Sequence, residues 1–207
     1  MIDAQNRLWH HSVIAILSAL FFYTLYLSDI RISQASGIVA FFILSLVMII
    51  GPLAVLLPAI ARKTLGDFPW SWRAELGIWF AIWSIIHFLI LLNHKEWDIL
   101  NYISGLSPWG FGSLIAVIMA IVLAILSFRK AIAFLGTESW KWIQNYFTYV
   151  IWWLLVLHII WAFKRAGFPP STLIHWTYLI IIILIPILQI AGFIKIVSQN
   201  KKADKEQ

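Results

Sequence analysis

The stretch WFAIWSIIHFLILLNH, residues 79–94, decides how this chain folds. Between Trp79 and Leu92 only Ser84 and His87 carry polar side chains. An apolar run of this kind, about 18 residues or more, is typical of a helix that crosses a lipid bilayer. An imidazole placed in hydrocarbon needs a partner, because burying an unpaired polar group costs free energy. The stretch therefore predicts a membrane-spanning helix and marks His87 as a functional candidate.

The same pattern repeats along the chain. Of the 207 residues, 62% are hydrophobic and only 12% are charged. Short polar stretches separate six apolar runs, which predict helices at about residues 10–28, 36–60, 74–93, 111–128, 142–163 and 172–195. The expected fold class is an all-α integral membrane protein, a six-transmembrane-helix bundle. We expect residues 1–200 to form a single transmembrane domain and residues 196–207 to form a polar cytoplasmic tail.

The distribution of lysine and arginine predicts the orientation of the bundle. If both termini lie on one side, that side holds eleven of the fifteen basic residues: Arg7, Arg62, Lys63, Arg73, Arg129, Lys130, Lys141, Lys195, Lys201, Lys202 and Lys205. The other side holds four: Arg31, Lys95, Lys164 and Arg165. Loops rich in lysine and arginine stay in the cytoplasm. We therefore expect both termini to be cytoplasmic.

Several classes of function are disfavoured by composition. The chain has no cysteine, which excludes disulfides, thiolate metal sites and haem attached through cysteine. The net charge of +6 comes from short loops between spans, so it indicates membrane orientation and not nucleic-acid binding. We find no cleavable signal peptide. No Asp, Glu, Lys or Arg lies in the middle of a predicted span, which disfavours an ion-coupled transporter.

Two histidines lie well inside predicted spans at matching depths. His87 is eight residues before Lys95, and His158 is six residues before Lys164. At 1.5 Å per residue they lie roughly 12 Å and 9 Å below the outer boundary of the bilayer. A neutral imidazole can give one nitrogen to iron and donate a hydrogen bond from the other. The matched depths favour a bis-histidine haem b. In the other interpretation, each histidine is bonded separately to a carbonyl or hydroxyl group of a neighbouring helix.

Four side chains near the outer boundary are candidates to contact a haem propionate or to hold an axial ligand: His94, Lys164, Arg165 and His175. His94 lies two helical turns after His87, on roughly the same face. Each of the four also has a simpler interpretation, as an interfacial residue or a loop charge. At the cytoplasmic side His10 and His11 begin the first span, where they either anchor the helix end or bind a cofactor near that side.

Three segments resemble the ferric reductase-like transmembrane family. They are RAELGIWFAIWSIIHFLI (73–90), GIVAFFILSLVMIIGPLAVLL (37–57) and SFRKAIAFLGTESWKWIQNYFTYVIWWLLVLHIIWA (127–162). The likeness extends over about residues 35–163 and is greatest to bacterial members that consist of this domain alone and supply electrons to a periplasmic methionine sulfoxide reductase. It implies haem binding, electron transport and a location in the bacterial inner (plasma) membrane.

The resemblance also implies a single haem. In two-haem members the third and fifth helices each carry two histidines, about four turns apart. Here the outer positions match His87 and His158, whereas the inner positions fall on Arg73 and Asn145. Arginine stays charged and asparagine is a poor donor to iron, so neither replaces an imidazole. We therefore expect one haem b, in the outer half of the bilayer.

The predicted function is a membrane b-type cytochrome, an oxidoreductase subunit that carries single electrons to an acceptor on the outer side. The predicted haem lies roughly 20 Å from the cytoplasmic face, so the expected donor is a quinol, an FMN bound at the inner side or a partner protein. Expected partners are the lipid bilayer and a redox protein or larger membrane complex. The alternative is an accessory or structural subunit of such a complex, with or without haem.

Overall fold

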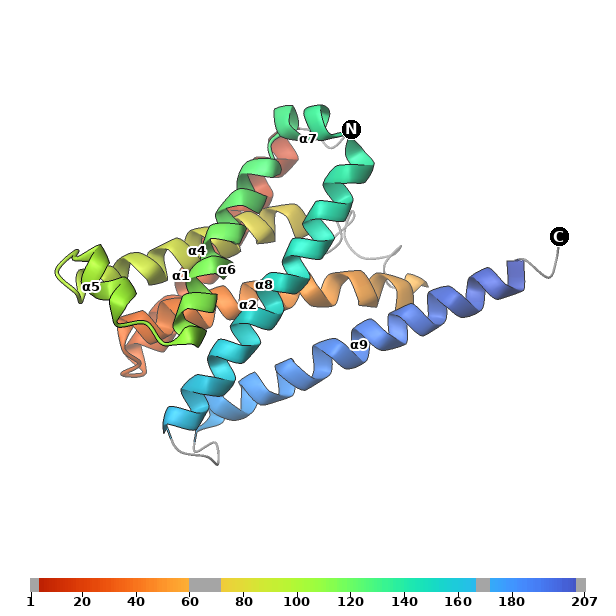
Figure 1. Ribbon diagram of the computed structural model, residues 1–207. Helices are drawn as coiled ribbons and strands as arrows, with labels where there is room; N and C mark the ends of the chain where they lie inside the picture. Colours follow the sequence, from red (N-terminus) through yellow and green to blue (C-terminus); the bar gives the residue numbers. More distant parts are fainter. Residues whose placement is uncertain (1–3, 60–71, 167–171, 204–207) are drawn as a thin grey trace. The chain divides into compact units, whose positions relative to one another are not determined.

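The computed structural model describes residues 4–59, 72–166 and 172–203, and every regular element in these ranges is a helix (Figure 1). The elements are α1 (Ala4–Leu27), α2 (Ile32–Leu56), α4 (Arg73–Asn93), α5 (Ile99–Ser104), α6 (Pro108–Leu126), α7 (Arg129–Leu135), α8 (Thr137–Ala166) and α9 (Leu173–Ala203). The six long ones are each apolar and long enough to cross a membrane. The predicted fold class, a six-helix membrane protein, is confirmed.

The helix ends differ from the predicted ones because hydropathy locates the apolar run and not the helix that contains it. Helix α8 begins at Thr137 and not near 142; an ion pair of 3.3 Å between Lys141 and Glu138 lies in these added turns. Helix α9 continues to Ala203, through most of the expected polar tail. The predicted end of the second span, at residue 60, lies outside the described residues, as do Arg62 and Lys63.

Two short helices, α5 and α7, occupy stretches between the predicted spans. Asp98 caps α5 by accepting a hydrogen bond of 2.9 Å from the backbone N–H of Asn101. Ser107 caps α6 in the same way, with Pro108 at the first helical position and a bond of 3.1 Å from Gly110. A capping side chain satisfies a backbone donor that the first helical turn leaves without a partner. Helices α5 and α7 are too short to show a helical period of apolar residues in the sequence.

The first of two compact units comprises residues 1–44 and 74–166. Its core is aromatic: Phe41 stacks on Trp152 with ring centroids 5.6 Å apart, and Phe22 lies 5.2 Å from Trp83. Helices α6 and α8 are joined by Gln144, whose Nε2 donates to the carbonyl of Leu123 and the hydroxyl of Ser127 at 3.1 Å each. Exposed apolar residues cover the outward faces, as on α1, where Leu20 is 58% exposed. Such faces suit a lipid environment.

The second unit comprises residues 45–73 and 167–207. Pro52 lies inside α2 and has no backbone N–H, so the carbonyl of Met48, four residues earlier, loses its usual helical hydrogen-bond donor. The side chain of Gln189, on α9, donates from Nε2 to this carbonyl of Met48 at 2.8 Å. Lys195 likewise donates to the carbonyl of Leu56 at the end of α2, at 3.1 Å.

Candidate functional site

His87 lies two turns before the end of α4 and directs its ring at the first turns of α2. Its Nδ1 lies 2.7 Å from the backbone carbonyl oxygen of Ser33 and 3.3 Å from the hydroxyl oxygen of Ser36. The same hydroxyl donates to the Ser33 carbonyl at 2.9 Å. The hydrogen-bond partner of the His87 ring is therefore the backbone of α2.

This contact fixes which ring nitrogen carries the proton. A carbonyl oxygen can only accept a hydrogen bond, so Nδ1 of His87 must be the donor. In the neutral imidazole the lone pair then lies on Nε2. Histidines that bind metal through Nε2 are held in the same way, because a backbone carbonyl at Nδ1 sets the tautomer and the ring orientation.

Gly37, one turn after Ser33 on α2, supplies the surface against which this ring packs. A Cβ atom at position 37 would lie 3.1 Å from Cε1 and 3.2 Å from Nδ1 of His87. Such contacts are tighter than ordinary packing, so a larger residue would push the ring away. The glycine and the Ser33 carbonyl thus form a cradle that holds the ring from its face and from its Nδ1 edge.

His158, on α8, is the second histidine of this site. Its ring lies close enough to His87 for the two imidazoles to interact electrostatically, and it approaches the backbone of Trp109 at the start of α6. Its Nδ1 is buried, and among the described residues this atom has no hydrogen-bond partner. A buried nitrogen without a protein partner is costly unless a ligand or water satisfies it.

The two side chains suit an iron porphyrin by their chemistry. They are imidazoles from two different helices of one unit, near each other in an apolar interior. His87 presents the Nε2 lone pair, and the ring of His158, whose Nδ1 is buried, interacts with the backbone of Trp109. Helical bundles place haem between facing helices in this manner. A site of three or more histidine or acidic ligands is not present in the described ranges.

The interior of the same unit, toward the beginning of α4, is filled by protein. Trp152 is 1% exposed and Phe41 is 3% exposed, and the two rings stack on each other. On α4, Trp83 lies one turn before His87 and is also buried.

The four candidates for propionate contact have different surroundings. His94 and Lys164 are exposed. Arg165 is exposed and lies over the ring of Trp161, 4.8 Å from its centroid. His175 belongs to the second unit, where its N–H bonds to the hydroxyl of Thr172 at 3.3 Å. Thr172 thereby caps the first turn of α9.

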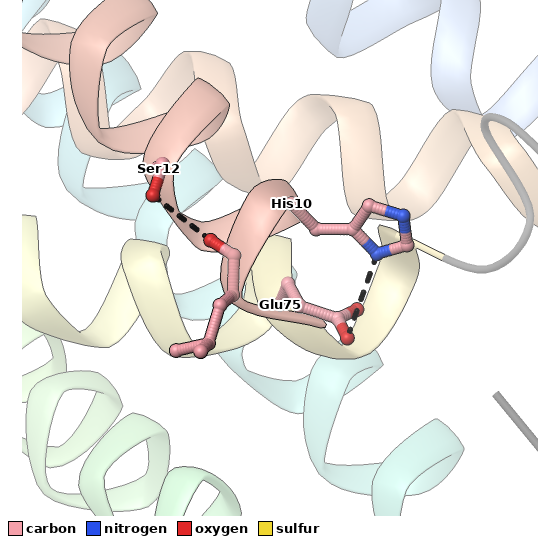
Figure 2. Close-up of polar contacts among 4 residues, drawn as sticks. His10, Ser12 and Glu75 are labelled. Atoms are coloured by element: carbon pink, nitrogen blue, oxygen red, sulfur yellow. Dashed lines mark hydrogen bonds and ion pairs between the residues drawn. The ribbon is translucent and has the colours of Figure 1, made fainter. Parts of the chain in front are cut away.

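A second buried polar pair joins the beginnings of α1 and α4 (Figure 2). Nδ1 of His10 lies 3.9 Å from Oε1 of Glu75, and their side chains are 11% and 5% exposed. The other carboxylate oxygen, Oε2, is buried and has no hydrogen-bond partner in the described part of the chain. Figure 2 also shows the Ser12 hydroxyl bonded to the carbonyl of Leu8 at 2.9 Å.

Sequence reasoning missed the cradle and this pair. The only hint of the cradle was SQASG, residues 33–37, a run of small and polar residues at a helix start. The hint of the pair was that His10 and Glu75 begin two spans predicted to start on the same side. Comparison with protein-family models, curated proteins and solved structures gave no match.

Proposed function

We propose that this protein is a membrane b-type cytochrome of the ferric reductase-like kind, with one haem held by His87 and His158. The observation that carries the proposal is the pairing of two imidazoles inside an apolar helical unit, one of them cradled so that Nε2 offers its lone pair. The resemblance of residues 35–163 to that family supports the same assignment.

The roles of the chain's own residues follow from this arrangement. The Ser33 carbonyl and Gly37 orient His87, and His158 supplies the opposite ligand. A bound haem supplies an iron that alternates between ferric and ferrous states. Two imidazole ligands on one iron would suit electron transfer. The apolar surroundings keep water from the site.

The direction of electron flow rests on the orientation inferred from basic residues. With both termini in the cytoplasm of a bacterial cell, the histidine pair lies in the outer half of the inner membrane. The acceptor is then a redox protein or small molecule on the outer side. The proposed donor is a quinol dissolved in the bilayer; a bound FMN is the second candidate.

Histidine variants test the ligand assignment. The wild-type protein, purified from cells supplied with haem, should show a b-type reduced-minus-oxidised spectrum. His87→Ala and His158→Ala should each lose it, because one imidazole alone holds haem weakly. His94→Ala is the matched control: it removes an exposed histidine of the same helix end and should keep the spectrum. Full haem content in both ligand variants would refute the assignment.

A second measurement separates the electron carrier from an accessory subunit. If the isolated chain carries electrons, added decyl-benzoquinol should reduce its haem. A chain that holds haem, resists reduction by quinol and purifies with other subunits would instead be an accessory subunit of a larger complex.

A further inference from the structure

We infer that one anionic phospholipid binds to the first unit, with an acyl chain in a groove on α1, α4 and α6 and its phosphate beside the basic start of α7. The groove lies within this unit and has a volume of about 280 Å³. Among the nine described residues that line it, His11 alone has a polar side chain, and the others are isoleucine, alanine or phenylalanine. Its interior therefore suits hydrocarbon, and its one polar contact lies on α1.

The groove follows two helices that are long and apolar enough to cross a bilayer. On α4 its lining extends from Ile78 to Ile85, about 10 Å along the helix axis. Ala81, which is 2% exposed, lies between these isoleucines, and Ala124 lies among the isoleucines of α6. Small side chains flanked by larger ones leave a hollow that runs along the helices, in the direction of the lipid chains. An acyl chain fills such a hollow without leaving a buried polar group unpaired.

One end of the groove lies at the head-group layer. Helices α1 and α4 begin at this end, and α6 ends there. His11 lies within two turns of the beginning of α1, and Phe128 lies two residues after the end of α6. The ends of a membrane-spanning helix reach the polar head groups. At this depth the ring of His11 can donate a hydrogen bond to a phosphate oxygen.

The segments that meet at this end are basic. Residues 4–28 and 99–137 contain no Asp or Glu. Their basic residues are Arg7, Arg129 and Lys130. Glu75, at the beginning of α4, has a side chain that is only 5% exposed and does not line the groove. Basic residues at a membrane surface attract anionic head groups, so the charge at this end favours an anionic phospholipid over a zwitterionic one.

Helix α7 places part of this charge at the membrane surface. Lys130 and Phe134 are four residues apart and share one face of α7. Both are exposed, and Phe134 is 88% exposed. An exposed aromatic ring beside a lysine is typical of a helix at the lipid interface, where the ring enters the acyl region and the ammonium group stays with the phosphates. Because Lys130 lies two residues after Phe128, which lines the groove, a phospholipid whose chain fills the groove has its phosphate near this lysine.

Photolabelling of the full-length protein in detergent micelles tests the site. The probe is phosphatidylglycerol with a diazirine in one acyl chain, and mass spectrometry identifies the labelled peptides. We expect labels between Ile78 and Ile85 of α4 and between Ile121 and Ile125 of α6. Unlabelled phosphatidylglycerol should compete about tenfold better than phosphatidylcholine with the same chains. Equal competition would refute the anionic head group, and labels spread over every exposed apolar face would refute the groove.

A pair of variants on α6 tests the position of the acyl chain. Ala124→Trp fills the groove and should lower labelling about tenfold. Val122→Trp is the matched control, because Val122 is 39% exposed and does not line the groove, and it should leave labelling unchanged. Equal labelling of the two variants would contradict the inference.

A pair of double variants tests the head group. Arg129→Gln/Lys130→Gln should remove the preference for phosphatidylglycerol over phosphatidylcholine and keep labelling in the groove, because the acyl-chain site is intact. Lys164→Gln/Arg165→Gln removes an adjacent basic pair at the end of α8 and should keep the preference. A preference that survives the first double variant would overturn the assignment of the phosphate to the start of α7.

A second copy of the chain is the competing occupant of the groove. The chain has no cysteine, so Ile82→Cys introduces a single thiol on the groove wall. Under mild oxidation this variant should remain monomeric; a disulfide-linked dimer would show that another copy covers the groove and would overturn the inference. None of these measurements uses haem, so their outcome is independent of the proposed function.

Discussion

Helix α4 has a histidine contact near each of its ends, and the two histidines, His87 and His10, have different partners. Near its last turns His87 donates to the neutral carbonyl of Ser33 at 2.7 Å. At its beginning Glu75 faces His10 at 3.9 Å, a carboxylate against an imidazole. A carbonyl partner fixes a neutral tautomer and leaves Nε2 available as a ligand. A carboxylate partner stabilises the charged ring and allows a proton to be taken up or released.

The difference shows how one apolar helix can carry two separate tasks. The neutral, cradled ring suits an iron ligand, which must not be protonated. The pair of imidazole and carboxylate joins the beginnings of α1 and α4. Variants at the two ends should therefore have different consequences: those at the carbonyl end should change the haem, and those at the carboxylate end should change stability.

The largest expected effect is the loss of one partner of the buried pair. His10→Ala leaves the carboxylate of Glu75, 5% exposed, without its counter-ion, which should lower the free energy of unfolding by about 3 kcal/mol. Unfolding in mixed micelles, followed by circular dichroism, measures this change. The haem content of the variant should equal that of the wild type.

The double variant His10→Leu/Glu75→Leu is the control for this prediction. Replacing both partners by apolar groups removes the buried charge altogether, so stability should return to within about 1 kcal/mol of the wild type. If the single variant loses haem while remaining folded, His10 is an iron ligand or supports one, and the division of tasks along α4 is wrong.

A smaller effect is expected from crowding the cradle. Gly37→Ala places a Cβ atom 3.1 Å from Cε1 of His87 and must displace the ring, which should weaken haem binding about tenfold. Gly77→Ala is a matched control, because a Cβ atom there meets nothing within 4 Å. Haem titration of the two variants measures the difference. Equal affinities would show that the ring position at α2 does not control haem binding.

The smallest effect is expected at the Ser36 hydroxyl. Its oxygen lies 3.3 Å from Nδ1 of His87, which already has the shorter bond to the Ser33 carbonyl. Ser36→Ala should therefore change stability by less than about 1 kcal/mol and leave the haem spectrum in place. A complete loss of haem would mean that the hydroxyl, and not the backbone, sets the tautomer of His87.

The spans could be predicted from the sequence because apolar length is a local property. Residues 79–94 identify α4 without any knowledge of its neighbours, and the same holds for the other long helices. The helix ends were harder to predict. They depend on particular side chains, such as the Thr172 cap of α9 and the Lys141–Glu138 pair of α8. Short helices such as α5 leave no periodic signal.

The partners of the histidines could not be predicted, because they depend on which faces of distant segments meet. Ser33 is 54 positions from His87 in the sequence, and its contribution is a backbone carbonyl that any residue could supply. Gln189 and Met48, which are joined by a hydrogen bond, are 141 positions apart. Depth matching drew attention to His87 and His158; it could not show the cradle that orients one of them.

The haem-to-protein ratio of the purified wild-type chain tests the central claim most directly. Our account predicts one b-type haem per chain, held by His87 and His158, which lie close enough to interact electrostatically. A ratio of zero after expression with ample haem would show that the two histidines only hold helices together, and a ratio of two would show that a second pair of ligands exists.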